Sequence, residues 1–226
     1  MARWERFDLD VPDDFPLAEL DAVHEHLSDS KSDAPQTNPA WAEWAGACNG
    51  IAYRYKACDE DATALAQSLA SSLSPPQPKR YDQERLLFAF FTEGLSCIGC
   101  FYYGVYFAGA MIDPAFFGSN VNRREVTPGR VVRAYQLRFP LEQVTAAMAA
   151  VHVDPATNAW REARNVLAHR ASPGRRFHEG GPLSGEAHWL GEGLSGDLIR
   201  ARREWLAVAM QALLRPAATF VQQHYV

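Results

Sequence analysis

The chain has 226 residues, of which 47% are hydrophobic and 12% aromatic, so it can bury a sizeable core and is not a disordered protein. A formal charge of −5 at pH 7 argues against a protein that coats nucleic acids without selectivity. The four cysteines lack the spacing of a disulfide framework, and the first residues contain no apolar signal segment. We therefore expect one globular domain in the cytoplasm.

Two helices are predicted in the first third of the chain. Apolar residues at helical spacing predict a helix over 16–28. Asn38 and Pro39 are a typical helix start, and the helix that they open continues to about Leu73, with an interruption near Asp59.

A third helix is expected from Asp82 to about Asp113. Its segment 94–112 has nineteen residues without a charge, a length that would also suit a membrane span. The tyrosines within it and the lack of a flanking positive cluster favour a central core helix. Cys97 and Cys100 form a CxxC pair without a second pair, which favours packing over a zinc or redox site.

The following residues carry weaker signals. Residues 115–139 are expected to be irregular, apart from a short strand or helical turn over 130–137. A short helix is predicted over 141–151, and a last helix over 197–224 should be interrupted or kinked at Pro216. The pattern as a whole predicts an all-α fold.

The strongest signals predict a helix over 155–171. Asp154 and Pro155 are typical of a helix start, and a proline and a glycine follow its end. Its apolar stripe consists of Ala156, Trp160, Ala163 and Leu167. Asn165 and His169 should share the face opposite Trp160, with Arg164 on the flank of the stripe.

Arg164, Asn165 and His169 stand within six residues and are the side chains that a metal-free ribonuclease needs. An imidazole can take a proton from a ribose 2′-hydroxyl, and a guanidinium can stabilise the charge that builds on the phosphate. The segment resembles the Arg-x4–6-His signature of the HEPN superfamily, which prefers a polar residue directly after the arginine. The alternative is a solvated histidine in the last helical turn, where the helix dipole favours its cation.

The resemblance implies a HEPN-like helical bundle over 80–226, with 1–79 as an N-terminal helical extension. It implies a hydrolase that needs no metal or cofactor, acts on RNA as a homodimer and places Arg164, Asn165 and His169 in the catalytic site. Glu93 is the candidate for a supporting acidic residue on another helix. Family members of this type often serve as toxins of toxin–antitoxin pairs or as phage-defence effectors, so an antitoxin or regulatory protein is an expected partner, and a membrane is not.

Charge is unevenly distributed along the chain. Residues 1–33 have three basic and ten acidic side chains, a net charge of −7, whereas residues 161–176 have five arginines and one glutamate, a net charge of +4. A local basic patch suits selective phosphate contact, although arginines near a helix C-terminus also simply favour the helix dipole. The expected substrate-binding residues are Arg161, Arg170, Arg175 and Arg176.

Seven glycines lie within residues 172–196, a stretch that also contains His178, His188 and Trp189. We expect either a substrate-binding or lid segment or an ordinary loop. No Walker loop, HExxH or GxSxG sequence competes with the ribonuclease hypothesis. Two other hypotheses stay open: a non-catalytic HEPN-like module that binds a nucleotide, RNA or a protein, and a helical assembly protein in which the motif is coincidental.

Overall fold

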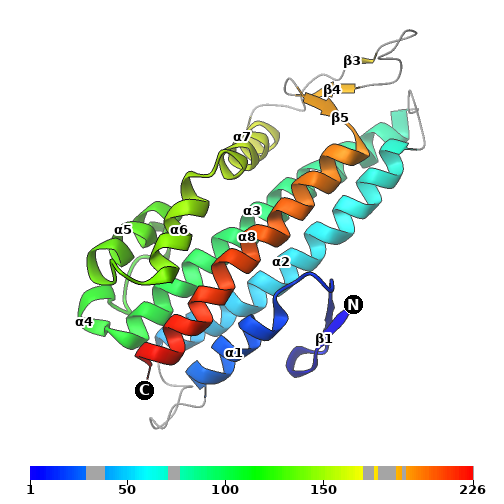
Figure 1. Cartoon of the computed structure of the whole chain (residues 1–226). Coiled ribbons are helices and arrows are strands. Elements are labelled where there is room, and N and C mark those ends of the chain that lie inside the picture. The colour runs from blue at the N-terminus through cyan, green and yellow to red at the C-terminus, as the bar shows by residue number, and fades with distance from the viewer. Residues whose placement is uncertain (29–38, 71–76, 170–175, 178–186, 190–191, 226) are drawn as a thin grey trace. The chain divides into compact units, whose positions relative to one another are not determined.

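The computed structural model describes residues 1–28, 39–70, 77–169, 176–177, 187–189 and 192–225, and it confirms the all-α fold. The helices are α1 (Leu17–Ser28), α2 (Pro39–Ala70), α3 (Gln77–Ile112), α4 (Pro114–Phe117), α5 (Pro128–Arg138), α6 (Gln143–Val153), α7 (Pro155–His169) and α8 (Gly196–His224) (Figure 1). Short 3-10 helices cover Glu5–Phe7 and Arg123–Glu125. The strands are β1 (Ala2–Trp4), β2 (Leu9–Val11), β3 (Arg176–Phe177), β4 (Ala187–Trp189) and β5 (Glu192–Leu194).

The chain folds into two compact units. The first consists of Met1–Arg54, Ser96–Asp154 and Ala207–Val226, and the second of Tyr55–Leu95 and Pro155–Leu206. Helices α2, α3 and α8 therefore each contribute residues to both units. This division cuts across the expected segments 1–79 and 80–226, because each of those segments contains residues of both units.

Aromatic side chains of α3 form the core of the first unit. The Tyr102 hydroxyl donates to the Met148 carbonyl of α6, and the Tyr135 hydroxyl of α5 donates to the Val105 carbonyl, both at 2.7 Å. Helix α3 is long and apolar enough to cross a membrane, but 61% of its most apolar window is buried within the protein. It is the expected core helix.

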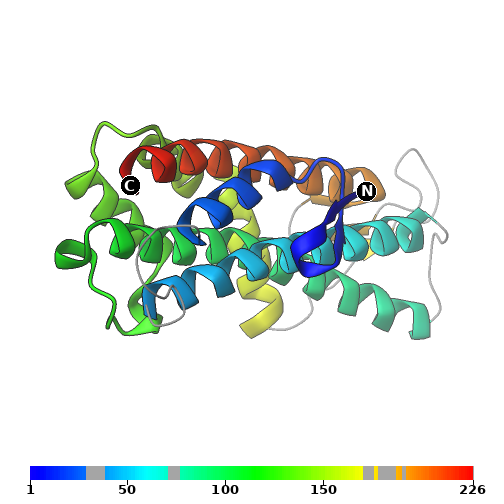
Figure 2. The same cartoon turned by 90° about the horizontal axis from the view of Figure 1, so that it is seen from below.

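Helix α1 packs on the end of α8 in the first unit. Figures 1 and 2 show the two helices running beside each other. Nε of Arg215 lies 3.5 Å from a Glu19 oxygen, and the His26 ring forms a hydrogen bond with the Tyr225 carbonyl at 2.7 Å.

An antiparallel hairpin, β1–β2, precedes α1 in the chain and pairs Ala2 with Val11. The sequence analysis missed this hairpin, because strands of three residues are too short for a period of two to be visible.

Neither of the two predicted interruptions, near Asp59 and at Pro216, is present, and the kink that was the alternative at Pro216 stays a prediction. Helix α2 continues through Asp59, whose carboxylate accepts a 2.7 Å hydrogen bond from Arg203 Nε and so does not compete for the backbone. Helix α8 continues through Pro216, which leaves the Ala212 carbonyl without its helical donor. Ala212 is exposed, so water can bond to that carbonyl.

The expectation of irregular structure over 115–139 was wrong, whereas the helical one of the two alternatives for 130–137 is present, as part of a helix of eleven residues. Helices α4 and α5 and a 3-10 turn occupy most of this segment. Pro128 begins α5, and Val131, Val132 and Tyr135 form its buried face. Helix α3 also begins at Gln77, five residues before the predicted start at Asp82.

Candidate functional site

Helix α7 belongs to the second unit and begins at Pro155 as predicted. Trp160 and Ala163 of the predicted stripe are buried, and Ala156 and Leu167 are half-buried. Thr157 is also fully buried, which the apolar pattern could not reveal because threonine is polar. The side chains on this face fix the rotation of α7 about its axis.

A close contact between Trp160 and Gly94 anchors α7 to α3. A Cβ atom added at Gly94 would lie 2.3 Å from Cζ3 of the Trp160 ring, so only glycine admits the indole here. The indole also packs on Phe90, Phe91 and Trp205, with ring centroids 4.8, 5.0 and 6.3 Å away. Trp160 therefore holds α7 in place through α3 and α8.

The motif residues lie where the predicted helix places them, as far as they are described. Arg164 is half-buried on the flank of the stripe, and Asn165 is exposed. His169 is the last residue of α7, and its side chain lies outside the described residues. The helical period puts Arg161, Asn165 and His169 on one row, four residues apart, with Arg164 beside it.

Arg164 and Asn165 have uncommitted polar groups. Within the part of the chain that the structure describes, neither side chain has an ion pair or a side-chain hydrogen bond. A half-buried guanidinium is partly withdrawn from water, so binding of an anion to it lowers the free energy. The end of α7 therefore offers a cation and an amide to a phosphate.

Arg203, in the same unit, shows the opposite case. Only 11% of its side chain is exposed, its Nε bonds to Asp59, and its guanidinium lies 4.8 Å from the centre of the Tyr55 ring. This arginine has a structural role, because its charge is already compensated by Asp59.

Glu93 is half-buried on α3, next to Gly94. It forms no ion pair with Arg164. Its charge acts instead on Asp61 of α2: burial, and then the negative charge of Glu93, raise the pKa of Asp61 to about 6. The structure thus places Glu93 beside a second carboxyl group that no sequence signal pointed to.

The remaining candidate residues are only partly described. Arg161 is half-buried and donates a 2.9 Å hydrogen bond to Asn158 on its own helix. Arg176 lies in β3, opposite His188 of β4, in the antiparallel sheet β3–β4–β5; nothing is described of either side chain. Arg170, Arg175 and His178 lie outside the described residues.

The CxxC cysteines take part in packing, as expected. Cys97 is buried, and its Sγ lies 3.4 Å from the Ile51 carbonyl oxygen. Cys100 is half-buried and faces Gly50, where an added Cβ would lie 2.8 Å from its sulfur. Among the described residues, no three His, Cys, Asp or Glu side chains gather as a metal site would require.

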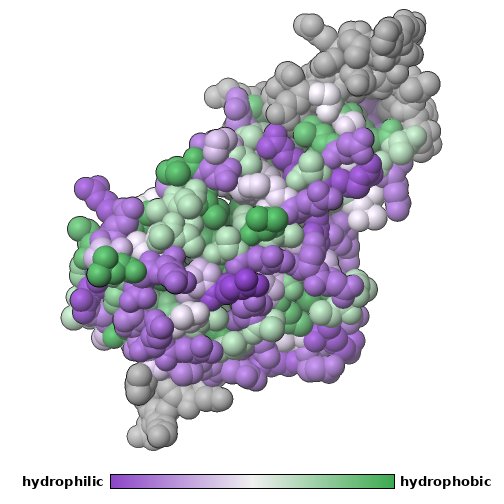
Figure 3. Space-filling view, viewed as in Figure 1, coloured by the Kyte–Doolittle hydropathy of each residue, from purple (hydrophilic) through white to green (hydrophobic). Residues whose placement is uncertain are grey.

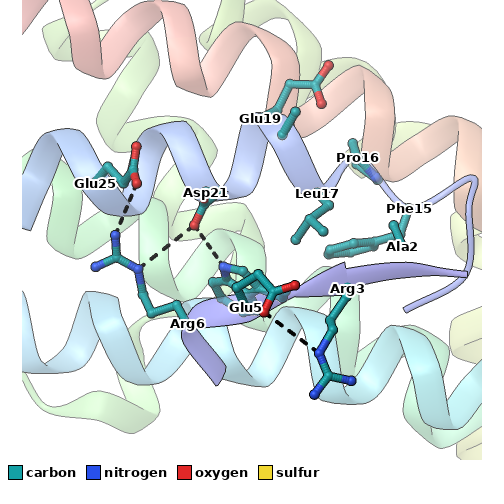
Figure 4. A pocket seen from close by; sticks show the side chains of 12 residues that line it. Ala2, Arg3, Glu5, Arg6, Phe15, Pro16, Leu17, Glu19, Asp21 and Glu25 are labelled. Carbon is teal, nitrogen blue, oxygen red and sulfur yellow. Dashed lines mark hydrogen bonds and ion pairs between the residues drawn. The ribbon is translucent and has the colours of Figure 1, made fainter. Parts of the chain in front are cut away.

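Sequence analysis also missed a cavity in the first unit. It has a volume of about 680 Å³ and lies between the β1–β2 hairpin and α1 (Figure 4). Its polar groups bond to one another: Arg6 lies 3.2 Å from Glu25, and Trp4 Nε1 donates to Asp21 at 2.8 Å. These pairs hold the hairpin to α1, so the charged groups named here already interact with one another rather than with a ligand.

Comparisons with known proteins give this chain no relative: no family model, no curated protein and no solved structure matches it.

Proposed function

We propose that this chain is a metal-independent endoribonuclease of the HEPN type, with its site at the end of α7. The observation that carries the proposal is the pair Arg164 and Asn165, whose polar groups are uncommitted among the described residues on a helix that Trp160 holds firmly. His169 ends the same helix, and histidine is the residue type whose reference pKa lies nearest to neutral pH.

The proposed reaction is attack of a ribose 2′-oxygen on the adjacent phosphorus. The P–O5′ bond breaks, which leaves a 2′,3′-cyclic phosphate on one fragment and a 5′-hydroxyl on the other. His169 acts as general base or general acid, and Arg164 stabilises the extra negative charge of the phosphorane. Asn165 orients one of these two groups or the phosphate between them.

The basic residues around the site would bind the RNA backbone. Arg161 lies one turn before Arg164 on α7, and Arg176 lies in β3. With Arg170 and Arg175 they would give binding a strong dependence on salt. Within this proposal the protein works in the cytoplasm as a homodimeric toxin or phage-defence effector, and an antitoxin or other regulatory protein restrains it.

The test is an incubation of the purified full chain with total RNA in EDTA, followed by analysis of the fragment ends. We expect cleavage with 2′,3′-cyclic phosphate and 5′-hydroxyl ends. RNA binding of similar affinity without any cleavage would favour the non-catalytic module, for which the same uncommitted Arg164 and Asn165 argue. Neither cleavage nor binding would leave an assembly protein.

A further inference from the structure

The N-terminal hairpin β1–β2, residues 2–11, has a buried apolar face and an exposed charged face. Trp4 and Val11 are buried, with 2% and 0% of their surfaces exposed. Arg3 and Asp8 are exposed, and Figure 3 shows mostly hydrophilic surface at the lower right, where the hairpin lies. The stability of the hairpin on the protein therefore depends on what lies beneath its inner face.

A histidine of α1 lies beneath this face. Only 5% of His24 is exposed. Its ring is nearly perpendicular to the rings of Trp4 and Phe7, at centroid distances of 6.2 and 5.5 Å. Nδ1 of His24 lies 3.4 Å from the Ser28 hydroxyl, which itself donates to the His24 carbonyl at 2.7 Å. Two rings of the hairpin thus pack on an imidazole that is almost completely withdrawn from water, a position that suits its neutral form.

The two carboxylates near His24 already interact with the hairpin. Nη2 of Arg6 lies 3.2 Å from Glu25, and its Nε lies 3.9 Å from Asp21 (Figure 4). Trp4 Nε1 donates to Asp21 at 2.8 Å. A proton on His24 would place a second cation beside Arg6, so the two would repel each other and compete for the same carboxylates. Protonation would therefore weaken the contacts that hold the hairpin on α1.

The surroundings of His24 also set the direction of the pH dependence. Burial, and next the positive charge of Arg6, lower the pKa of His24 from its ordinary value of 6.5, against the opposing charges of Asp21 and Glu25. When the hairpin opens, the ring returns to water, so the open form takes up the proton at a higher pH than the closed form does. The closed form is therefore most favoured above about pH 6.5 and loses stability relative to the open form as the pH falls below that value.

We propose that the β1–β2 hairpin is a pH-sensitive latch on α1, which neutral His24 holds closed and protonated His24 releases. Release exposes Trp4 and Val11 without breaking a larger sheet, because β1 and β2 pair only with each other among the described strands. A cavity of about 680 Å³ already separates part of the hairpin from α1. The proposal does not depend on ribonuclease activity.

The test is amide hydrogen exchange of the full chain without RNA, measured by mass spectrometry at pH 7.5 and pH 5.5 and corrected for the intrinsic exchange rates. Carboxyl groups with ordinary pKa values stay ionised at both pH values. Protection of residues 2–11 should fall about three- to ten-fold at pH 5.5. Ten-fold is about the most that a single proton can contribute one pH unit below the reference pKa of histidine.

Two pairs of variants test the groups involved. His24→Gln keeps a neutral polar side chain and should remove the fall in protection, whereas His26→Gln should keep it, because the His26 ring bonds to the Tyr225 carbonyl. Arg6→Gln should reduce the fall, since a protonated His24 then meets two carboxylates without a competing arginine. Arg3→Gln is its control and should leave the fall unchanged, because the ion pairs of Arg3 lie within the hairpin.

Circular dichroism checks that the variants fold. Wild-type protection that is the same at both pH values, or an undiminished fall in a folded His24→Gln protein, would overturn the proposal. A titration of the His24 ring in the wild type by NMR needs no variant: its pKa should lie below 6.5, and an ordinary or raised pKa would also overturn the proposal.

Discussion

The arginines of the N-terminal hairpin and Arg164 of α7 have opposite surroundings. Arg6 lies 3.2 Å from Glu25, and Arg3 lies 3.3 Å from Asp10. Arg164 faces no carboxylate in the part of the chain that the structure describes. A guanidinium that already binds a carboxylate has few donors left for a phosphate, whereas an uncommitted one keeps its donor fork free.

This difference teaches that net charge alone does not locate a binding site. The acidic first 33 residues contain Arg6, which joins the hairpin to Glu25 of α1, and Arg3, whose ion pairs lie within the hairpin. The basic stretch 161–176 contains Arg164, which forms no ion pair in the described structure. Arg203 in the second unit is a further example, because its guanidinium forms an ion pair with Asp59 and lies over the Tyr55 ring.

The largest expected change in stability comes from Arg203→Met. It leaves the Asp59 carboxylate without its cation and removes the contact with the Tyr55 ring, so the free energy of unfolding should fall by about 2–3 kcal/mol in urea denaturation. Arg200→Met is the control, because its pair with Asp197 is exposed and should matter by less than about 0.5 kcal/mol. If both variants lowered the free energy of unfolding equally, the distinction between buried, paired arginines and exposed ones would not hold.

A smaller change is expected from Gly94→Ala, which tests how α7 is held. The new methyl group overlaps the buried Trp160 ring, and we expect a loss of about 1–2 kcal/mol in thermal unfolding. Adding Trp160→Phe should cost less in this variant than in the wild type, since the shorter ring relieves the overlap. Gly46→Ala is the control: nothing lies within 4 Å of its added Cβ, so it should stabilise α2 by up to about 1 kcal/mol. A neutral Gly94→Ala would mean that α7 moves freely on α3.

The smallest effect concerns Asp61. Because its pKa rises from 3.8 to about 6 on folding, its contribution to stability is complete below about pH 4 and is lost as the pH rises to 6. The group is half-exposed, so solvent screening should limit the change to less than about 1 kcal/mol. In urea titrations at a series of pH values, Asp61→Asn should remove this dependence of the unfolding free energy on pH. Asp82→Asn, at an exposed position of α3, should keep it. A slope that persists in Asp61→Asn belongs to another group.

The local chemistry of α7 was readable from the sequence. Pro155 marks its start, and the spacing of Trp160 and Ala163 gives its buried face. Helix α5 was expected only as a short strand or a helical turn over 130–137, because its apolar residues Val131 and Val132 are β-branched and suit a strand equally well.

Through-space pairs were beyond the sequence. Asp61 and Glu93 are 32 positions apart, and Arg203 and Asp59 are 144 apart, so no spacing rule joins them. Which arginines are compensated depends on such pairs, and only the folded chain reveals them.

The most direct test of the central claim is the rate of RNA cleavage in EDTA by Arg164→Ala, compared with Arg133→Ala, an exposed arginine of α5. The account predicts a loss of at least about 100-fold for Arg164→Ala and His169→Ala, little further loss in the double variant, and less than a two-fold change for Arg133→Ala. All of these proteins should melt like the wild type. Undiminished cleavage by a folded Arg164→Ala protein would contradict the account.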